Sequence, residues 1–143
     1  MAKRKLKTVA QEVEAAAKLL QRLVRLKASD DNGYCQCVTC GKVDHYKAMQ
    51  GGHFIPRGRT VFKLFEENIH PQCPSCNLWG MKQAHYVLRY RQWMVDAYGQ
   101  RRVKAMERLA WRASPKFNRD EVIQFQRDLK AQIKDQEWRI GEI

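Results

Sequence analysis

Apolar residues recur with the spacing of a helix near the N-terminus. Their steps alternate between four and three residues, at Val9, Val13, Ala16, Leu20 and Leu23. This spacing places them in one stripe on one face of a helix. Thr8 stands where a cap is needed, and Gly33 follows a polar cluster that ends the pattern. The pattern therefore predicts a helix over residues 8–28, preceded by a basic arm.

The helical pattern returns at Asn77 and continues to the end of the chain. Its first stripe consists of Tyr86, Tyr90, Trp93 and Ala97. Gly99 follows this stripe as a C-terminal stop signal. The sequence therefore predicts a helix that begins near Asn77 and ends before Gly99.

Two further helices are predicted after this stop. The first runs from about Gln100 to Arg112, where Ser114-Pro115 breaks the pattern. Asn118 is placed to cap the last helix, with acidic residues in its first turn. The stripe of this helix consists of Val122, Phe125, Leu129, Ile133, Gln136 and Ile140.

The first and last stripes, Val9–Leu23 and Val122–Ile140, have two interpretations. Each is either packed within the core of its own chain or forms the seam of a homodimer. Coiled-coil seams usually sustain their pattern over more turns than these stripes do, which favours packing within the chain.

The middle of the chain, residues 34–76, has no helical periodicity. Gly, Pro and Cys residues separate short runs there, including HYKAMQGGHFI and VFKLF. These two runs fit the strands of a hairpin, the first of which ends at Pro56. The basic segment 56–60 is then the connecting loop.

Length and composition indicate one globular domain over residues 1–143, mainly helical and of the α+β class. A chain of 143 residues with 44% hydrophobic content is large enough for one modest core. No apolar run approaches the ~20 residues that span a bilayer, and the basic N-terminus has no apolar core of a signal peptide. We therefore expect no membrane partner, and a cytoplasmic location in which thiols stay reduced.

The charge of the chain favours a polyanionic partner. Lys and Arg number 27 against 15 Asp and Glu, which gives a net charge of +12. A basic surface of this kind binds nucleic acid because each neutralised phosphate releases counterions. A merely solubilising surface usually mixes the two signs more evenly. We therefore expect a nucleic acid as the partner.

Two Cys-x-x-Cys pairs give the strongest chemical signal. They are Cys37 with Cys40 and Cys73 with Cys76. Two spacer residues let one tight turn supply two thiolates to a tetrahedral zinc ion, and four cysteines close its coordination shell. We therefore predict a structural Zn²⁺ site; the alternatives are redox dithiols or buried thiols. The fifth cysteine, Cys35, has a spacing that suits the site less well and is expected to be a free thiol, although it could substitute for Cys37.

Between and after the cysteine pairs lie His53, Asn68 and Asn77, in an order that resembles the HNH nucleases, also called ββα-metal or His-Me finger enzymes. His53 follows two glycines at the end of a predicted strand, and Asn77 follows the second cysteine pair at the start of a helix. The resemblance implies that His53 is a general base, that Asn68 holds the loop and orients the histidine, and that Asn77 ligates a catalytic Mg²⁺ or Mn²⁺. It also implies a zinc-stabilised ββα core over residues 33–98, as in phage endonuclease VII, flanked by the N-terminal helix (8–28) and by C-terminal helices (100–143).

Longer blocks resemble the phage NinG (Rap) recombination proteins. They are GGHFIPRGR, FEENIHPQCPSCN, a Tyr-Gly before RRVKAMERL, and SPKFNRDEVIQFQRDLKAQIKDQE. This resemblance covers about residues 30–136. It implies a phage or prophage protein in the cytoplasm of the bacterial host, acting as a structure-specific endonuclease on Holliday junctions and D-loops.

One position departs from the HNH pattern. Many of these enzymes have an acidic residue or a second histidine before the catalytic histidine as a metal ligand, and here that residue is Gly52. His85 is a candidate for the second ligand because it lies two helical steps of four after Asn77. Glu66 and Glu67 are other candidates, whereas the dyad Asp44-His45 falls too near the first cysteine pair.

The sequence thus predicts a metal-dependent endonuclease for branched DNA. Three basic residues beside His53 are expected to hold the phosphates: Arg57, Arg59 and Lys63. Two symmetric cuts at a junction favour a homodimer. The alternatives are a zinc-containing module that binds nucleic acid without catalysis, and an HNH nuclease that acts on linear duplex.

Overall fold

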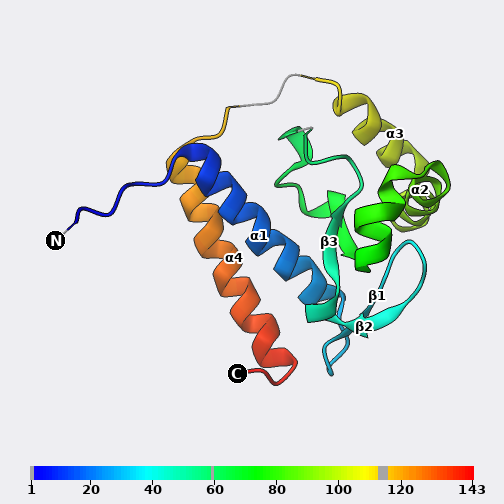
Figure 1. Cartoon of the computed structure of the whole chain (residues 1–143), viewed down its shortest axis with the longest axis horizontal. Helices are drawn as coiled ribbons and strands as arrows, with labels where there is room; N and C mark the ends of the chain where they lie inside the picture. The colour runs from blue at the N-terminus through cyan, green and yellow to red at the C-terminus, as the bar shows by residue number, and fades with distance from the viewer. Residues whose placement is uncertain (1, 59, 113–115) are drawn as a thin grey trace.

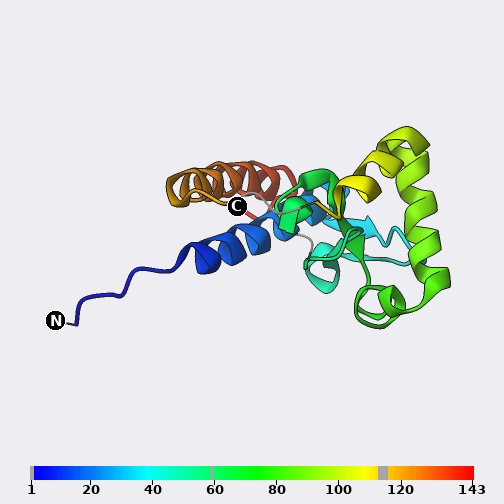
Figure 2. The same ribbon diagram turned by 90° about the horizontal axis from the view of Figure 1, so that it is seen from above.

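The computed structural model describes residues 2–58, 60–112 and 116–143. Its helices and strands are α1 (Val9–Ala28), β1 (Tyr34–Gln36), β2 (Val43–His45), β3 (Gln50–His53), β4 (Ile69–Gln72), α2 (Ala84–Tyr98), α3 (Gln100–Leu109) and α4 (Arg119–Arg139). The strands form two antiparallel hairpins, β1–β2 and β3–β4. These hairpins lie between the pair α1 and α4 on one side and the pair α2 and α3 on the other (Figures 1 and 2). The expected mixture of helices with a small strand-containing middle is therefore present.

The start of α1, the end of α2 and the start of α4 lie at the predicted signals. Thr8 caps α1 through a reciprocal pair of hydrogen bonds with Gln11, and the side chain of Asn118 accepts from two backbone N–H groups of α4. Gly99, with a φ of 89°, ends α2. These caps satisfy backbone groups that would otherwise lack partners, so local sequence suffices to fix the boundaries. The predicted break at Ser114-Pro115 lies outside the described residues.

Helices α1 and α4 run parallel and bury their stripes against each other. Gln126 donates to the backbone carbonyl of Glu12 near the start of α1, and Arg139 donates to the carbonyl of Leu26 near its end. The apolar residues buried along the two helices are Val13, Ala16, Ala17, Leu20, Leu23, Val24, Leu26, Val122, Leu129 and Ile133. Both stripes are therefore used within one chain, and neither is a free seam for a dimer.

The second hairpin differs from the predicted one. His53 lies opposite Ile69 and Gln50 opposite Gln72, so the partner strand is IHPQ. The run VFKLF, predicted as a strand, instead belongs to the connection between the strands, and Phe62 is buried there against other apolar side chains. The carbonyl of Pro71 accepts from the Val38 N–H, so the backbone groups of this residue face the outer edge of the hairpin. Proline is tolerated in β4 because the pairing with β3 needs no N–H from this residue.

The predicted continuous helix from Asn77 is also wrong. Residues Ser75–Trp79 form a wide helical turn, Gly80–Lys82 form a tighter one, and Gln83 is extended before α2 begins. Gly80 lies against Tyr86 so closely that an added Cβ would stand 2.8 Å from the ring. The chain therefore folds back on itself here instead of continuing as one helix. Among the residues that the structure describes, no helix is both long and apolar enough to cross a membrane.

Candidate functional site

The four predicted cysteines come together from two separate turns. The Sγ atoms of Cys37, Cys40, Cys73 and Cys76 all lie within 4.8 Å of one another. The distance from Cys40 Sγ to Cys73 Sγ is 3.7 Å. A tetrahedral zinc ion with bonds of about 2.3 Å places its sulfur ligands roughly 3.8 Å apart. The cluster therefore has the dimensions of a zinc site and could hold one zinc ion.

Backbone geometry shapes both cysteine turns. Gly41, with a φ of 80°, donates its N–H to the Cys37 carbonyl at 3.0 Å, and Asn77 donates its N–H to the Cys73 carbonyl at 3.0 Å. Burial opposes ionisation of Cys37, but backbone N–H groups of the turns outweigh it and lower the pKa of this thiol. Cys35 is buried outside the cluster, where burial raises its pKa to about 11. Among the described residues it is therefore a separate thiol, as expected.

Asn68 holds the connection between β3 and β4. Its side chain is fully buried, its Oδ1 accepts from the Ile55 N–H at 2.7 Å, and its Nδ2 donates to the carbonyls of Ile55 (3.0 Å) and Phe62 (3.3 Å). Asn68 thereby ties together two parts of the connecting segment. The residue after Phe62 is Lys63, whose carbonyl contacts His53. Asn68 therefore also helps to hold the backbone that contacts His53.

His53 ends β3 with only 8% of its surface exposed. Its Nε2 lies 3.3 Å from the carbonyl oxygen of Lys63. Burial lowers the pKa of His53 to about 4, with smaller contributions from the nearby cations Arg57 and Lys63 and an opposing one from the Lys63 carbonyl. The ring is therefore neutral near pH 7. The tautomer that donates Nε2–H to Lys63 leaves Nδ1 with the lone pair that can accept a proton.

A cavity of about 390 Å³ brings His53 and Asn77 together. Arg57 and Lys82 also line it, with apolar residues and with Gln21 from α1. The hairpin approaches α1 closely here: a Cβ added to Gly51 would stand 2.6 Å from the Cβ of Gln21. The order along the chain is β3, β4 and then the helical turn that carries Asn77. A neutral imidazole, an amide side chain and two cations therefore share one cavity.

Asn77 is the metal-binding candidate that lies in this cavity. Its Nδ2 donates to Gln50 Oε1 at 2.7 Å, which leaves Oδ1 as its ligand atom. No carboxylate is found among the described residues of the cavity wall. Mg²⁺ retains several waters and is usually held by one or two carboxylates together with substrate phosphates. The side chains of the described cavity wall offer amide oxygens but no carboxylate, so they do not form a complete metal site on their own.

Gly52 has a structural reason to be glycine. A Cβ at this position would stand 1.8 Å from Oε1 of Gln72, on a side of the hairpin that this buried side chain already fills. Gln72 donates its Nε2 to Thr39 at 2.8 Å, and its Oε1 is buried without a partner among the described residues. No side chain at residue 52 can therefore serve as the second metal ligand.

The other candidates for this ligand lie elsewhere. His85 is exposed beside Tyr86, and the helical spacing that related it to Asn77 does not exist because the helix is broken between them. Glu66 pairs with Lys27 at 2.7 Å, and Glu67 pairs with Arg102. None of these three side chains is among the residues that line the cavity with Asn77.

Two of the predicted phosphate-binding residues are joined by an unpredicted carboxylate. Glu14 of α1 forms ion pairs with Arg57 and with Lys63, the second at 2.8 Å. The hydrogen bond from Lys63 is the main cause that lowers the pKa of Glu14. The sequence carried no signal for this contact, since Glu14 is one of several polar residues on α1. Arg59 lies outside the described residues.

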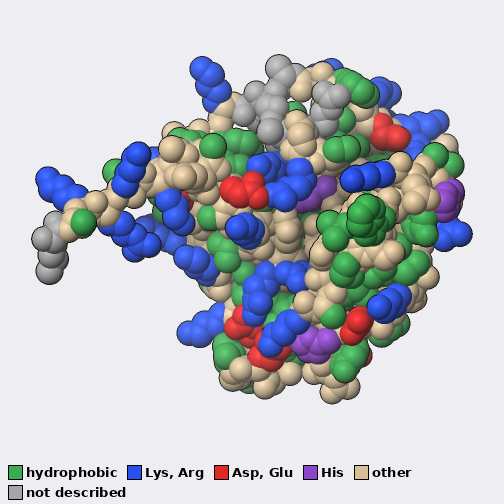
Figure 3. All heavy atoms as spheres, in the orientation of Figure 1, with side chains coloured by type: hydrophobic (Ala, Val, Ile, Leu, Met, Phe, Trp, Pro, Cys, Tyr) green, Lys and Arg blue, Asp and Glu red, His purple; other side chains and the backbone are tan. Residues whose placement is uncertain are grey.

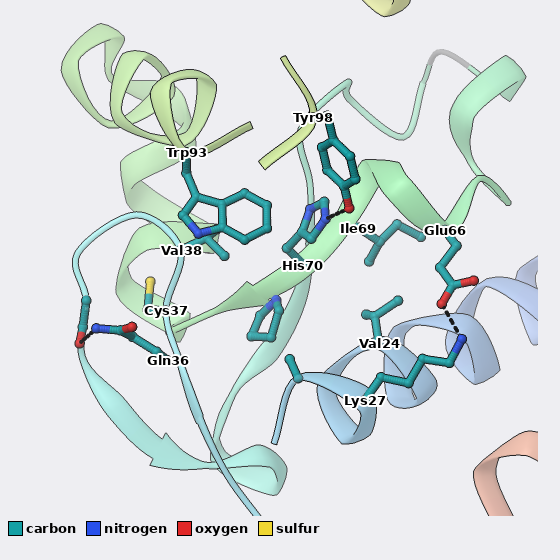
Figure 4. Close-up of a pocket in the computed structure, with 13 residues that line it drawn as sticks. Val24, Lys27, Gln36, Cys37, Val38, Glu66, Ile69, His70, Trp93 and Tyr98 are labelled. Atoms are coloured by element: carbon teal, nitrogen blue, oxygen red, sulfur yellow. Dashed lines mark hydrogen bonds and ion pairs between the residues drawn. The ribbon is translucent and has the colours of Figure 1, made fainter. Parts of the chain in front are cut away.

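A larger pocket, of about 540 Å³, lies on another part of the molecule (Figure 4). His70 and Trp93 line it, with Tyr98 at the end of α2. The ring nitrogens of His70 contact the hydroxyls of Tyr90 (3.0 Å) and Tyr98 (2.8 Å). Both ring nitrogens are therefore engaged in contacts within the protein. Burial lowers its pKa to about 4.

Basic side chains cover much of the surface. In the orientation of Figure 1, they extend from the N-terminal arm over α1 and across the middle of the face (Figure 3). Lys18, Arg22 and Lys130 also line the groove between α1 and α4. A polyanion can therefore contact the molecule well beyond the cavity itself.

These features define a class: a small, basic α+β protein built around a four-cysteine site that can bind zinc. The chain matches the family model described as Bacteriophage Lambda NinG protein over residues 1–138. It therefore belongs to this phage protein family, as the sequence blocks indicated. No match was found among curated proteins, and none among solved structures.

Proposed function

We propose that this protein is a metal-dependent endonuclease that hydrolyses phosphodiester bonds in branched DNA. The observation that carries the proposal is the cavity that His53 shares with Asn77 and Arg57. The succession of hairpin and helical turn around it agrees with the HNH pattern inferred from the sequence. A module that only binds nucleic acid has no need for a neutral, buried imidazole at this place.

His53 acts as the general base. Its Nδ1 accepts a proton from water, the water oxygen bonds to phosphorus, and the bond from phosphorus to the 3′ oxygen breaks. The Lys63 carbonyl keeps the ring in the required tautomer through Nε2. A phosphate bound next to the ring adds negative charge, which raises the pKa of His53 above its value of about 4 in the free protein and makes the ring a stronger base.

Asn77 and the basic residues position the scissile phosphate. Asn77 would hold Mg²⁺ or Mn²⁺, and such an ion would supply positive charge that stabilises the leaving oxygen. Arg57 and Lys63 bind phosphate oxygens once DNA displaces Glu14 from them. A zinc ion held by the four cysteines would fix the turn that carries Asn77.

The choice of branched DNA and of phage recombination rests on the NinG resemblance. Holliday junctions and D-loops are the substrates that it implies, and the host cytoplasm is the corresponding location. Two symmetric cuts require two active sites, so we propose a homodimer. Its contact lies outside the stripes of α1 and α4, which are buried within the chain.

The test compares a labelled four-way junction with a linear duplex of equal length. Zinc-loaded protein is incubated with each substrate in the presence of Mg²⁺ or Mn²⁺. We expect cleavage of the junction, no cleavage by His53→Ala, and wild-type cleavage by His85→Ala, which removes an exposed histidine. If neither DNA is cut, or if His53→Ala cuts as well as wild type, the catalytic proposal is wrong.

The second candidate is a zinc-containing module that binds nucleic acid without catalysis, which the net charge of +12 favours equally. It predicts binding to both DNA substrates and cleavage of neither. A third candidate, an HNH nuclease for linear duplex, predicts equal cutting of the two substrates. The same experiment therefore separates all three.

A further inference from the structure

The turn that carries Asn77 also exposes two large apolar side chains. Leu78 is 52% exposed and Trp79 is 68% exposed, and they follow Asn77 directly. Most large apolar residues of this chain pack into its core clusters, and neither of these two is a member of one. A single exposed apolar residue needs no explanation, but two adjacent ones beside a cavity form an apolar surface that a partner can cover.

The surroundings of Trp79 connect it with the candidate active site. Leu78 and Lys82 line the cavity that contains His53 and Asn77. The Nζ atom of Lys82 lies 5.7 Å from the centre of the Trp79 ring. The ring is thus connected with the cavity wall through Leu78 and Lys82, and it has a cation beside it. A flat apolar surface next to a positive charge is suited to a nucleobase and its phosphate.

The geometry of DNA decides which bases an aromatic side chain can reach. Within a continuous duplex every base is stacked between its neighbours, so an aromatic side chain cannot reach the face of a base. At a branch point the stacking is interrupted and base faces become exposed. We propose that Trp79 stacks on a base exposed at the branch point and thereby gives the protein its preference for branched DNA. The inference rests on the proposed function in two respects, that DNA binds over this cavity and that branched DNA is preferred.

Trp138 provides a matched control. It is 75% exposed, close to the exposure of Trp79, but lies near the end of α4 in the helix pair on the other side of the hairpins (Figure 1). If any exposed tryptophan strengthened DNA binding, the two residues would behave alike. Only the position of Trp79 beside the cavity distinguishes them.

The experiment measures binding in the absence of added Mg²⁺ and Mn²⁺, so that cleavage is not required. Fluorescence anisotropy gives the affinity of zinc-loaded protein for a labelled four-way junction and for linear duplex. We expect Trp79→Ala to weaken junction binding about tenfold or more, the usual effect of removing one base–aromatic stack, with little change for duplex. Trp79→Phe restores most of the affinity, and Trp138→Ala changes neither.

A fluorescent 2-aminopurine at the branch point reports the stack itself. Its emission is quenched by wild type and by Trp138→Ala, and is not quenched by Trp79→Ala. Unchanged junction binding by Trp79→Ala, or an equal loss on both DNAs, overturns the inference. So does a change in sedimentation that shows Trp79 to be a contact between protein copies. A protein that binds junctions through Trp79 but never cuts them would overturn the nuclease proposal and leave this inference standing.

Discussion

Replacement of Asn68 by alanine tests how the connection between β3 and β4 holds His53. The variant loses three hydrogen bonds, one from the Ile55 N–H and one each to the carbonyls of Ile55 and Phe62. An unsatisfied buried N–H costs about 1–3 kcal/mol, and the carbonyls add less because water reaches them as the loop loosens. We expect a loss of roughly 3 kcal/mol in the free energy of unfolding, which lowers Tm by about 10 °C for a chain of this length.

The loosened loop also changes the environment of His53. Its pKa of about 4 results mainly from burial, and the Lys63 carbonyl that contacts its Nε2 belongs to the same connecting segment. Opening this segment in Asn68→Ala therefore raises the pKa of His53 toward the ordinary value of about 6.5. Proton NMR of the His53 ring across the pH range measures this change, and thermal unfolding of the zinc-loaded protein measures the stability.

Asn32→Ala is the matched control, because Asn32 is exposed in the turn before β1 and its replacement leaves both measurements unchanged. Asn68 does not hold the connecting segment if Asn68→Ala unfolds within about 0.5 kcal/mol of wild type, a difference typical of surface substitutions, or if the pKa of His53 does not rise.

Three further predictions concern the metal, the ion pairs and the pH dependence. Cys73→Ser or chelation removes zinc and with it on the order of 10 kcal/mol of folding free energy, so circular dichroism will show unfolding; Cys35→Ser keeps one zinc per chain by elemental analysis. Glu14→Gln frees Arg57 and Lys63 and strengthens DNA binding at low salt in anisotropy titrations, whereas Glu107→Gln, which breaks only the pair with Arg91, does not. The pKa values of His53 and His70 are lowered to about 4 in the folded protein, whereas an unfolded histidine has a pKa of about 6.5. Between these values the unfolded chain binds more protons than the folded one, so stability is lost as pH falls from about 6.5 to about 4. Urea titrations will show a smaller loss over this window for His53→Gln, and an unchanged one for the exposed His85→Gln.

The elements that follow from local sequence were predictable. Thr8, Gly99 and Asn118 act on residues within one turn of themselves, so the ends of α1 and α2 and the start of α4 can be inferred without the rest of the fold. The four cysteines were predictable for a related reason, since the spacing within each pair is itself the local requirement of a metal turn.

The elements that depend on distant contacts were not predictable. VFKLF has the composition of a strand, but Phe62 packs into an apolar cluster and its carbonyl accepts a hydrogen bond from Asn68. These contacts hold the run in the connecting segment, so the strand that pairs with β3 is IHPQ. The break after Trp79 depends on the approach of Gly80 to Tyr86. The ion pairs of Glu14 with Arg57 and Lys63 join residues far apart in the chain, and no periodicity marks them.

The proposed role of His53 as the base of a hydrolytic site can be tested with one rate. Single-turnover cleavage of a four-way junction is measured with excess zinc-loaded protein and Mg²⁺, for wild type and for His53→Ala. General-base catalysis contributes about 10²–10⁴-fold, so we expect His53→Ala to be at least about 100-fold slower while it binds the junction as tightly as wild type. A variant that cleaves within a factor of about three of the wild-type rate, a difference of under 1 kcal/mol in the barrier, would contradict this role.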